Sequence, residues 1–362
     1  MTELLNKLQG TLPWDRALIT DSLSDEDVDI LVSATPACPE KVMVTIDHNV
    51  PSGTVAVAAR QRKLLDFARS NSLPFQYGQG IGYYLAMETL SPGDIVICNG
   101  RHAATVGAVG AIGLSLDVPS LKAALESGTA ALDAPLCRLR LEGELTHHVS
   151  ATDLALHLIA LGGLAGNLLA IHGPQMSFDQ RVTLCNLLAN AGVVSAFFVD
   201  ELPETDVVCD LSAVTPLAVL PGDFSEIVPS SRMDGLRVNQ VFIGGCCGGS
   251  IESLRKTAAI WQGKKINKHV RVMVSPATAA IYAQAIDDGL IETLMASGAL
   301  IMNQGCGACW AQGQGRCDER EVFLTTGSIN CANWAGKQHN GIYITSVEHA
   351  ARAALTGSLY EN

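Results

Sequence analysis

The chain has 362 residues, more than one ordinary domain, and its 48% hydrophobic and 17% charged content suits a large buried α/β core. The net charge of −12, with no basic run longer than GKK at 263–265, argues against a nucleic-acid surface. No uninterrupted apolar stretch reaches about eighteen residues, so the sequence predicts no membrane span. The N-terminus is polar, and its lack of a secretory segment and the eleven cysteines favour reduced thiols in a cytoplasmic protein.

The first predicted region, residues 1–146, alternates strands and helices. Short apolar or alternating runs predict strands at 42–46, 94–98 and 139–145, and helical spacing predicts helices at 55–70 and 119–126. The stretch 105–116 is rich in glycine and alanine, which lets backbones pack closely or forms a turn beside a ligand.

Two further regions follow, residues 147–235 and 236–362. The second predicts an apolar helix capped by Ser150 or Thr152, another helix at 180–191, and an extended linker at 201–235. The third predicts strands at 241–243, 270–274 and 300–302 and helices at 251–262 and 278–288. Alternation of this kind predicts three α/β domains with mainly parallel sheets, whose ligands bind at the carboxyl ends of the strands.

Three cysteines carry the chemistry. Cys246 follows a predicted strand, and Cys306 and Cys309 form a CxxC after another strand. Three thiolates are too few for a closed zinc site, but they hold three irons of a cubane cluster and leave the fourth iron open. An open iron is a Lewis acid that can bind a hydroxyl and a carboxylate. The adjacent Cys247 is a competing ligand, and the remaining cysteines are interpreted as small buried hydrophobic residues.

A series of motifs from about residue 40 to 362 resembles the aconitase superfamily, in particular the isopropylmalate dehydratase large subunits. The motifs are DHNVP (47–51), GQGI (78–81), the H-x-x-T-x-GA-x-GA run (102–111), HVSATDL (148–154), TLCN (183–186), DGLRVNQVFIGGC (234–246), GGSIESLR (248–255), VSPAT (274–278) and GCGACWA (305–311). The resemblance implies an aconitase-like fold of three α/β domains around a central cleft.

The resemblance also implies a hydro-lyase with a 4Fe-4S cluster on Cys246, Cys306 and Cys309. In that family the carbon base comes from a swivelling domain, which is a separate small subunit in some members. The chain ends about fifty residues after Cys309, so the resemblance implies a small swivel-domain partner and a small hydroxy acid as substrate.

The expected catalytic residues are Asp47, His48 and His102. An adjacent Asp–His pair after a strand can orient an imidazole as an acid, although a turn-capping aspartate beside a surface histidine is the alternative. Positions implied to bind substrate are Arg101, Tyr83, Asn186, Asn190, Ser328 and Asn333, with Tyr84 as the alternative to Tyr83.

Several family positions are changed. Gly100 and Arg101 stand where the family has Asp-Ser before its histidine, a tyrosine replaces a histidine after the GQGI turn, and Asn190 replaces a glutamate. The family's NRNFxGR run is GSINCAN (327–333), which leaves Ser328 and Asn333 in place of two arginines.

Each lost carboxylate clamp removes about 1.5–3 kcal/mol per charged hydrogen bond. The sequence therefore predicts a substrate other than citrate or isopropylmalate, smaller or more neutral, or one whose carboxylate Arg101 binds from another wall. Three alternatives stay open: an isomerase that keeps the cluster, a non-catalytic iron-sulfur sensor, and a zinc-bound or bare scaffold.

Overall fold

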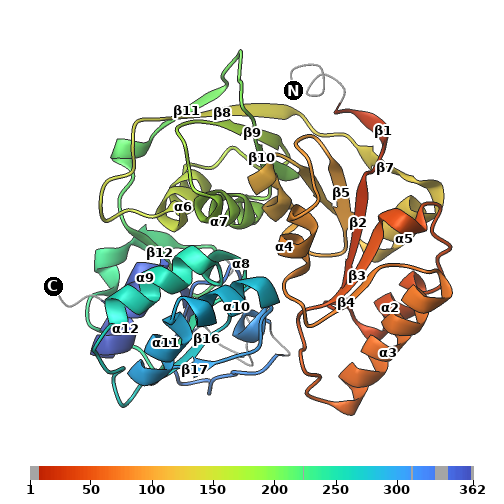
Figure 1. The fold of residues 1–362 in the computed structure, drawn as a ribbon. Coiled ribbons are helices and arrows are strands. Elements are labelled where there is room, and N and C mark those ends of the chain that lie inside the picture. Colours follow the sequence, from red (N-terminus) through yellow and green to blue (C-terminus); the bar gives the residue numbers. More distant parts are fainter. Residues whose placement is uncertain (1–7, 223, 311–312, 331–340, 360–362) are drawn as a thin grey trace.

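The computed structural model describes residues 8–222, 224–310, 313–330 and 341–359. Three sheets with flanking helices follow one another along the chain, coloured red to orange, yellow to green, and cyan to blue in Figure 1. This mixed arrangement, mostly of parallel strands, confirms the predicted fold class.

The first sheet has five parallel strands in the order β4-β3-β2-β5-β6. They are β2 (Arg16–Thr20), β3 (Val42–Ile46), β4 (Phe75–Tyr77), β5 (Ile95–Cys98) and β6 (Ile112–Ser115). The helices are α2 (Asp25–Leu31), α3 (Val55–Ser70), α4 (Gly82–Met87) and α5 (Val118–Ser127). The glycine- and alanine-rich stretch forms the 3₁₀ helix Ala103–Val109 and then β6, and β1 (Gly10–Pro13) pairs with β7 (Thr129–Leu132).

The second sheet has four parallel strands in the order β10-β9-β8-β11. They are β8 (Leu136–Glu142), β9 (Leu168–His172), β10 (Ser195–Phe198) and β11 (Val207–Asp210), with α6 (Ala151–Leu161) and α7 (Phe178–Leu188). Strand β8 lies within predicted region 1–146 but pairs in this second sheet. The three domain boundaries remain predictions. Helix α6 packs on β12 and α7 on α8, so both helices join the second sheet to the third unit.

The third sheet has seven strands in the order β13-β12-β19-β18-β15-β16-β17. They are β12 (Leu217–Val219), β13 (Ile227–Pro229), β15 (Gln240–Ile243), β16 (Arg271–Val274), β17 (Leu300–Ile301), β18 (Phe323–Thr325) and β19 (Ile342–Ile344). The helices are α8 (Gly245–Gly248), α9 (Ile251–Trp261), α10 (Ala279–Asp287), α11 (Leu290–Ser297) and α12 (Val347–Thr356), and β14 (Leu236–Arg237) pairs with β20 (Ser358–Leu359).

The prediction of an extended linker at 201–235 is wrong for part of that range. The range contains β11, which joins the second sheet, and β12 and β13, which form an antiparallel edge of the third. The apolar triplets Leu217–Val219 and Ile227–Pro229 are too short to give a clear alternating pattern, and the prolines, serines and aspartates between them hide the strands.

Parallel pairing places the functional loops together, because each follows the carboxyl end of a strand. Asp47 follows β3, Gly100 to His102 follow β5, Cys246 follows β15, and the CxxC follows β17. None of the helices in the described ranges has the length and apolar character needed to cross a bilayer.

Candidate active site

A cavity of about 190 Å³ lies where these loops meet. Its walls combine three thiols, two imidazoles, a carboxyl, a guanidinium, a phenol and an indole. The lining residues are Ser22, Asp47, His48, Ile81, Tyr83, Asn99, Gly100, Arg101, His102, Gly245, Cys246, Cys306, Cys309, Trp310, Ser328 and Ile329. The structure thus brings together most of the residues that the sequence singled out.

The three cysteines reach the cavity from two loops that small residues let approach closely. A Cβ added at Gly245 would lie 3.8 Å from Cys309 Sγ, and one at Gly327 only 2.9 Å from it. The backbone amide of Cys309 donates to the Cys306 carbonyl at 3.1 Å, which fixes the spacing of the CxxC. The three cysteines therefore border one cavity. Glycines beside Cys309 leave room there that a larger side chain would fill.

The electrostatics of the triad favour a cationic occupant. Burial raises the pKa of Cys306 to about 12 and the pKa values of Cys246 and Cys309 as well, and at Cys246 the nearby thiols raise it further. Three thiolates gathered without a cation are unfavourable, whereas metal ions stabilise thiolates and bind them in place of protons. The donor set thus fits a 4Fe-4S cluster that takes three protein ligands.

Cys247, the competing ligand, faces another direction. It is buried, and its Sγ donates to Asn186 Oδ1 at 3.2 Å. Only Cys246 of the adjacent pair lines the cavity with Cys306 and Cys309.

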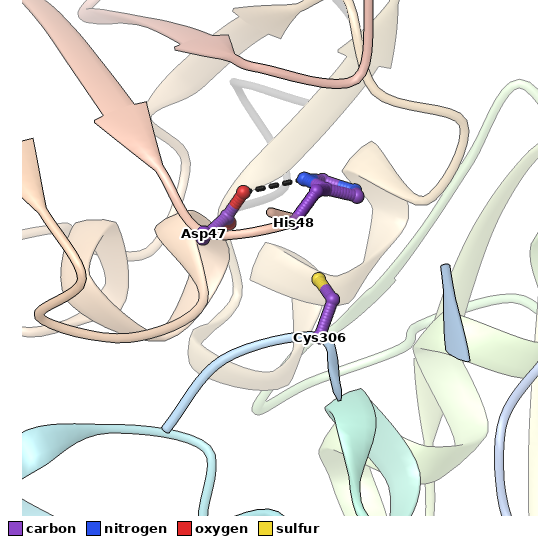
Figure 2. A group of neighbouring side chains, drawn as sticks. All are labelled: Asp47, His48 and Cys306. Carbon is purple, nitrogen blue, oxygen red and sulfur yellow. Dashed lines mark hydrogen bonds and ion pairs between the residues drawn. The ribbon is translucent and has the colours of Figure 1, made fainter. Parts of the chain in front are cut away.

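The Asp47–His48 pair faces the CxxC loop. Figure 2 shows the Cys306 sulfur directed towards the pair, and the Asp47 carboxylate, His48 ring nitrogen and Cys306 sulfur lie within 4.8 Å of one another. Asp47 Oδ1 lies 2.5 Å from His48 Nδ1, and Asp47 Oδ2 accepts a hydrogen bond from the Gly82 amide at 2.7 Å. Both carboxylate oxygens are therefore held, and the imidazole is oriented.

A second carboxylate beneath this loop was missed by sequence reasoning. Asp21, which follows β2, accepts the backbone amides of Asp47 at 3.1 Å and His48 at 2.9 Å through Oδ1. Its Oδ2 accepts from the Asn49 amide at 3.3 Å and from Gln61 Nε2 at 3.2 Å. The one signal available was an acid placed just after a strand end, as Asp47 is.

Charges around His48 favour its protonated form. Burial alone would lower the pKa of His48, but Cys306, when it is ionised, and the carboxylates of Asp47 and Asp21 raise it well above its ordinary value. Burial likewise opposes ionisation of Asp21, yet hydrogen bonds and the charge of His48 lower its pKa to about 2. The pair is an imidazolium held by two carboxylates.

His102 has the opposite electrostatic setting. It is 9% exposed, and burial, with Arg101 and His48 nearby, lowers its pKa to about 3. Ser328 Oγ lies 3.4 Å from His102 Nε2. The cavity therefore contains one charged and one neutral imidazole.

The two candidate tyrosines have different positions relative to the cavity. Tyr83 lines the cavity, with its hydroxyl 3.7 Å from Cys98 Sγ. Tyr84 does not line it, and its hydroxyl donates to the Cys246 carbonyl at 2.8 Å. Arg101 lies on the cavity wall with an exposed side chain.

Three predicted substrate-binding positions are placed elsewhere or not described. Asn186 is fully buried, and its Nδ2 donates to Thr105 Oγ1 at 2.9 Å. Asn190 Nδ2 donates to the carbonyls of Leu187 and Ser328, each at 3.2 Å. Asn333 lies outside the described residues.

The cavity also contains residues to which the sequence analysis assigned no role. Ser22 and Asn99 follow strand ends of the first sheet, and Trp310 closes the CxxC loop. The indole meets the His48 ring edge-on, with ring centroids 4.8 Å apart. The Asn99 amide donates to the Thr20 carbonyl at 3.1 Å and so holds two strand ends together.

Comparison with known proteins matches this arrangement to one family. The sequence profile of the Aconitase family (aconitate hydratase) covers residues 13–202 and 223–357. The 3-isopropylmalate dehydratase large subunit 1 of Deinococcus radiodurans is 30% identical, over 95% of this chain and 86% of that protein. The homoaconitase large subunit of Thermus thermophilus is also 30% identical, over 95% of this chain and 90% of that protein.

A solved structure extends the likeness to the fold. The holo-form crystal structure of aconitase X from Thermococcus kodakaraensis aligns with a TM-score of 0.61 at 14% identity, over 98% of this chain and 93% of that one. Identity this low concerns the fold alone. The family profile and the 30% relatives over nearly the whole length go further, and the chain belongs to the aconitase family.

Proposed function

We propose that this aconitase-family hydro-lyase depends on a 4Fe-4S cluster bound by Cys246, Cys306 and Cys309 and acts on a small hydroxy acid. The observation that carries the proposal is the shared cavity, in which three thiols meet the Asp47–His48 pair and His102. No disulfide joins any two of the described cysteines, which supports a reducing, cytoplasmic setting.

Side chains of this protein would supply the proton that the leaving hydroxyl needs. When bound, the cluster supplies an open iron that polarises the substrate hydroxyl. His48, held as an imidazolium by Asp47 and Asp21, is the proton donor for that oxygen. Neutral His102 accepts or donates a hydrogen bond in the same cavity, since its pKa of about 3 keeps it uncharged near neutrality.

The substrate would be neither citrate nor isopropylmalate. When the family's NRNFxGR run is aligned with residues 327–333, Ser328 lines the cavity at an arginine position, which removes a carboxylate clamp from that wall. Arg101, in the loop that follows β5, supplies a guanidinium to the same cavity. We therefore assign one substrate carboxylate to Arg101, with Tyr83 and Ser328 as neutral hydrogen-bonding partners. Asn186 and Asn190 are assigned a structural role behind the cavity wall.

The family's NRNFxGR motif can also be aligned with the chain four residues later, which affects this assignment. The pattern N-F-x-G-R also fits Asn333 to Lys337 in the sequence NWAGK, which puts a lysine where the second arginine stands. A lysine keeps one positive charge but not the bidentate geometry of a guanidinium. In this register too the first arginine is lost, because Ala332 stands there.

A small swivel-domain subunit would supply the carbon base. The Deinococcus radiodurans and Thermus thermophilus relatives are both named as large subunits, and this chain spans 86% and 90% of them. Among the described residues, Asp47 is the one carboxylate that lines the cavity, and it is already engaged by His48 and the Gly82 amide. A base from a second chain would complete the site.

Anaerobic purification with the co-expressed small subunit tests the proposal. We expect a brown protein with bound iron and sulfide that dehydrates hydroxy acids carrying one carboxylate and turns over neither citrate nor isopropylmalate. Ordinary turnover of either compound would refute the substrate assignment. A colourless protein containing zinc would refute the cluster, and a cluster without turnover would favour the sensor alternative.

A further inference from the structure

The hydroxyl of Tyr83 occupies the space that a side chain at residue 100 would need. A Cβ added at Gly100 would lie 1.9 Å from Tyr83 Oη and 3.1 Å from Tyr83 Cζ. Gly100 does not have a left-handed φ, so space rather than backbone conformation requires glycine there. The two residues come from different loops and both line the cavity.

These are two of the positions at which the chain departs from the family pattern it resembles. Tyrosine replaces a histidine after the GQGI turn, and glycine replaces an aspartate before Arg101. Since the side chains at positions 83 and 100 compete for one volume, the two departures are a single structural change. The change replaces an imidazole and a carboxyl with a single phenol, in the cavity that Arg101 also lines.

Tyr83 is held firmly but keeps hydrogen-bonding capacity. The residue is 6% exposed, and within the described part of the chain its hydroxyl meets one weak acceptor, Cys98 Sγ, at 3.7 Å. Cys98 Sγ is itself fixed by the Gly100 amide and carbonyl, each at 3.3 Å. The phenol can therefore donate to a cavity ligand at little cost.

We propose that Tyr83 is a specificity-determining residue of the cavity and that Gly100 positions it, by leaving the room into which the phenol enters. The hydroxyl is a neutral donor for the substrate oxygen that faces the wall carrying Arg101. This inference rests on the proposed hydro-lyase function for the identity of the ligand, but the pairing of the two residues does not.

A double-mutant cycle tests the pairing without a substrate. Gly100→Ala should lower the Tm of the full chain by roughly 2–6 °C, because the new methyl group overlaps the phenol oxygen. In the Tyr83→Phe background at least half of that loss should disappear, since the nearest atom then lies 3.1 Å away instead of 1.9 Å. An equal loss in both backgrounds would overturn the pairing.

Tyr84→Phe is the matched control, because its hydroxyl donates to the Cys246 carbonyl and not towards residue 100. Gly100→Ala and Tyr84→Phe should lower Tm additively. Rescue by Tyr84→Phe as strong as that by Tyr83→Phe would show a general loosening and overturn the assignment.

The specificity role is tested in the cluster-loaded complex with malate and its 4-monoamide as probes. Tyr83→Phe should raise KM for the better probe about tenfold or more, with kcat changed less than about twofold. An unchanged KM would overturn the role of the hydroxyl. Because the Tm cycle needs no turnover, a failed pairing and a failed hydro-lyase proposal give different results.

Discussion

The backbone amide of Cys306 donates a hydrogen bond to the carbonyl of Asp47 at 3.0 Å. A thiol of the cysteine triad and the carboxylate that orients His48 are thus joined through the main chain, although they lie in the third and first units of the fold. The spacing between the proposed proton donor His48 and the proposed cluster is set by the backbone rather than by flexible side chains.

Gly305 makes this contact possible, so Gly305→Ala should loosen it. The glycine has φ of +131°, and an added Cβ would lie 2.6 Å from the Asp47 carbonyl oxygen. We expect a loss of about 1–3 kcal/mol in the free energy of unfolding and faster loss of iron to a chelator. Gly263→Ala is the control, since its φ of +68° carries strain but no atom lies within 4 Å. Equal effects of the two variants would argue against a role for the close contact.

Asp21→Asn should destabilise the loop that carries Asp47 and His48. An amide keeps one acceptor but turns an NH₂ group towards donors of Asn49 and Gln61, which costs about 2–4 kcal/mol. Because the folded pKa of Asp21 is about 2 and the ordinary value is 3.8, its contribution is present above about pH 4 and is lost as pH falls towards 2.

Urea unfolding at about pH 7 and about pH 3 measures this difference. Asp15→Asn is the matched control, because Asp15 Oδ2 accepts one backbone amide, from Ile95 at 2.9 Å, and does not approach His48. A loss no larger than that of the control would contradict the supporting role of Asp21.

The adjacent cysteines should behave differently on substitution. Cys246→Ala should remove nearly all bound iron and sulfide, since two thiols remain for the cluster. Cys247→Ala should keep them and lose about 1 kcal/mol from its hydrogen bond to Asn186. Iron and sulfide analysis of anaerobically prepared proteins measures both, and the reverse pattern would make Cys247 the ligand.

The sequence predicted the residues that line the cavity better than the residues that hold them in place. Cysteine spacing after strand ends identified Cys246, Cys306 and Cys309, because thiol chemistry gives a local signal. The Asp47–His48 pair was selected by the family resemblance, since its place in a turn after a strand favours a turn-capping aspartate on its own. All of them border one cavity or face one another. The roles assigned to them stay predictions.

What sequence could not supply is direction. Tyr83 and Tyr84 are neighbours on α4, so their side chains point in directions about 100° apart around the helix axis. Tyr83 therefore lines the cavity, whereas the Tyr84 hydroxyl reaches the Cys246 carbonyl. Asn186 was placed with the substrate because it sits in a family motif, yet α7 turns it towards Thr105 and Cys247. Asp21 escaped notice because its partners are backbone amides of a distant loop, which leave no sequence pattern.

Stability should also depend on Asp179, which is 8% exposed at the start of α7. Burial raises its pKa to about 6, against opposing hydrogen bonds from Ser250 and Ser253. A raised folded pKa means that the folded state holds the proton more tightly, so stability falls as pH rises from about 4 to 6. Asp179→Asn should remove up to about 3 kcal/mol of this fall.

Unfolding free energies at about pH 4.5 and about pH 7.5 give the slope. Asp210→Asn is the control, since hydrogen bonds from Ser212 lower the pKa of that carboxyl and place its titration below this window. A slope unchanged by Asp179→Asn would show that other groups produce the pH dependence.

Asn186 links the cysteine loop to His102 through three consecutive hydrogen bonds. Cys247 Sγ donates to Asn186 Oδ1 at 3.2 Å, Asn186 Nδ2 donates to Thr105 Oγ1 at 2.9 Å, and Thr105 Oγ1 donates to the His102 carbonyl at 2.6 Å. In Asn186→Asp the carboxylate can only accept, so the Thr105 hydroxyl must turn its proton away from His102 to satisfy it.

We therefore expect Asn186→Asp to lower kcat about tenfold or more with a smaller change in KM, because His102 loses an anchor while the cavity wall is unchanged. Asn167→Asp is the control, since its Nδ2 donates to carbonyls of Leu164 and Ala165 and takes no part in the cavity wall. Both variants lose a donated hydrogen bond, so a fall in kcat common to both would reflect stability alone. If Asn186→Asp instead raised KM and left kcat intact, the side chain would belong with the substrate, as its motif first indicated.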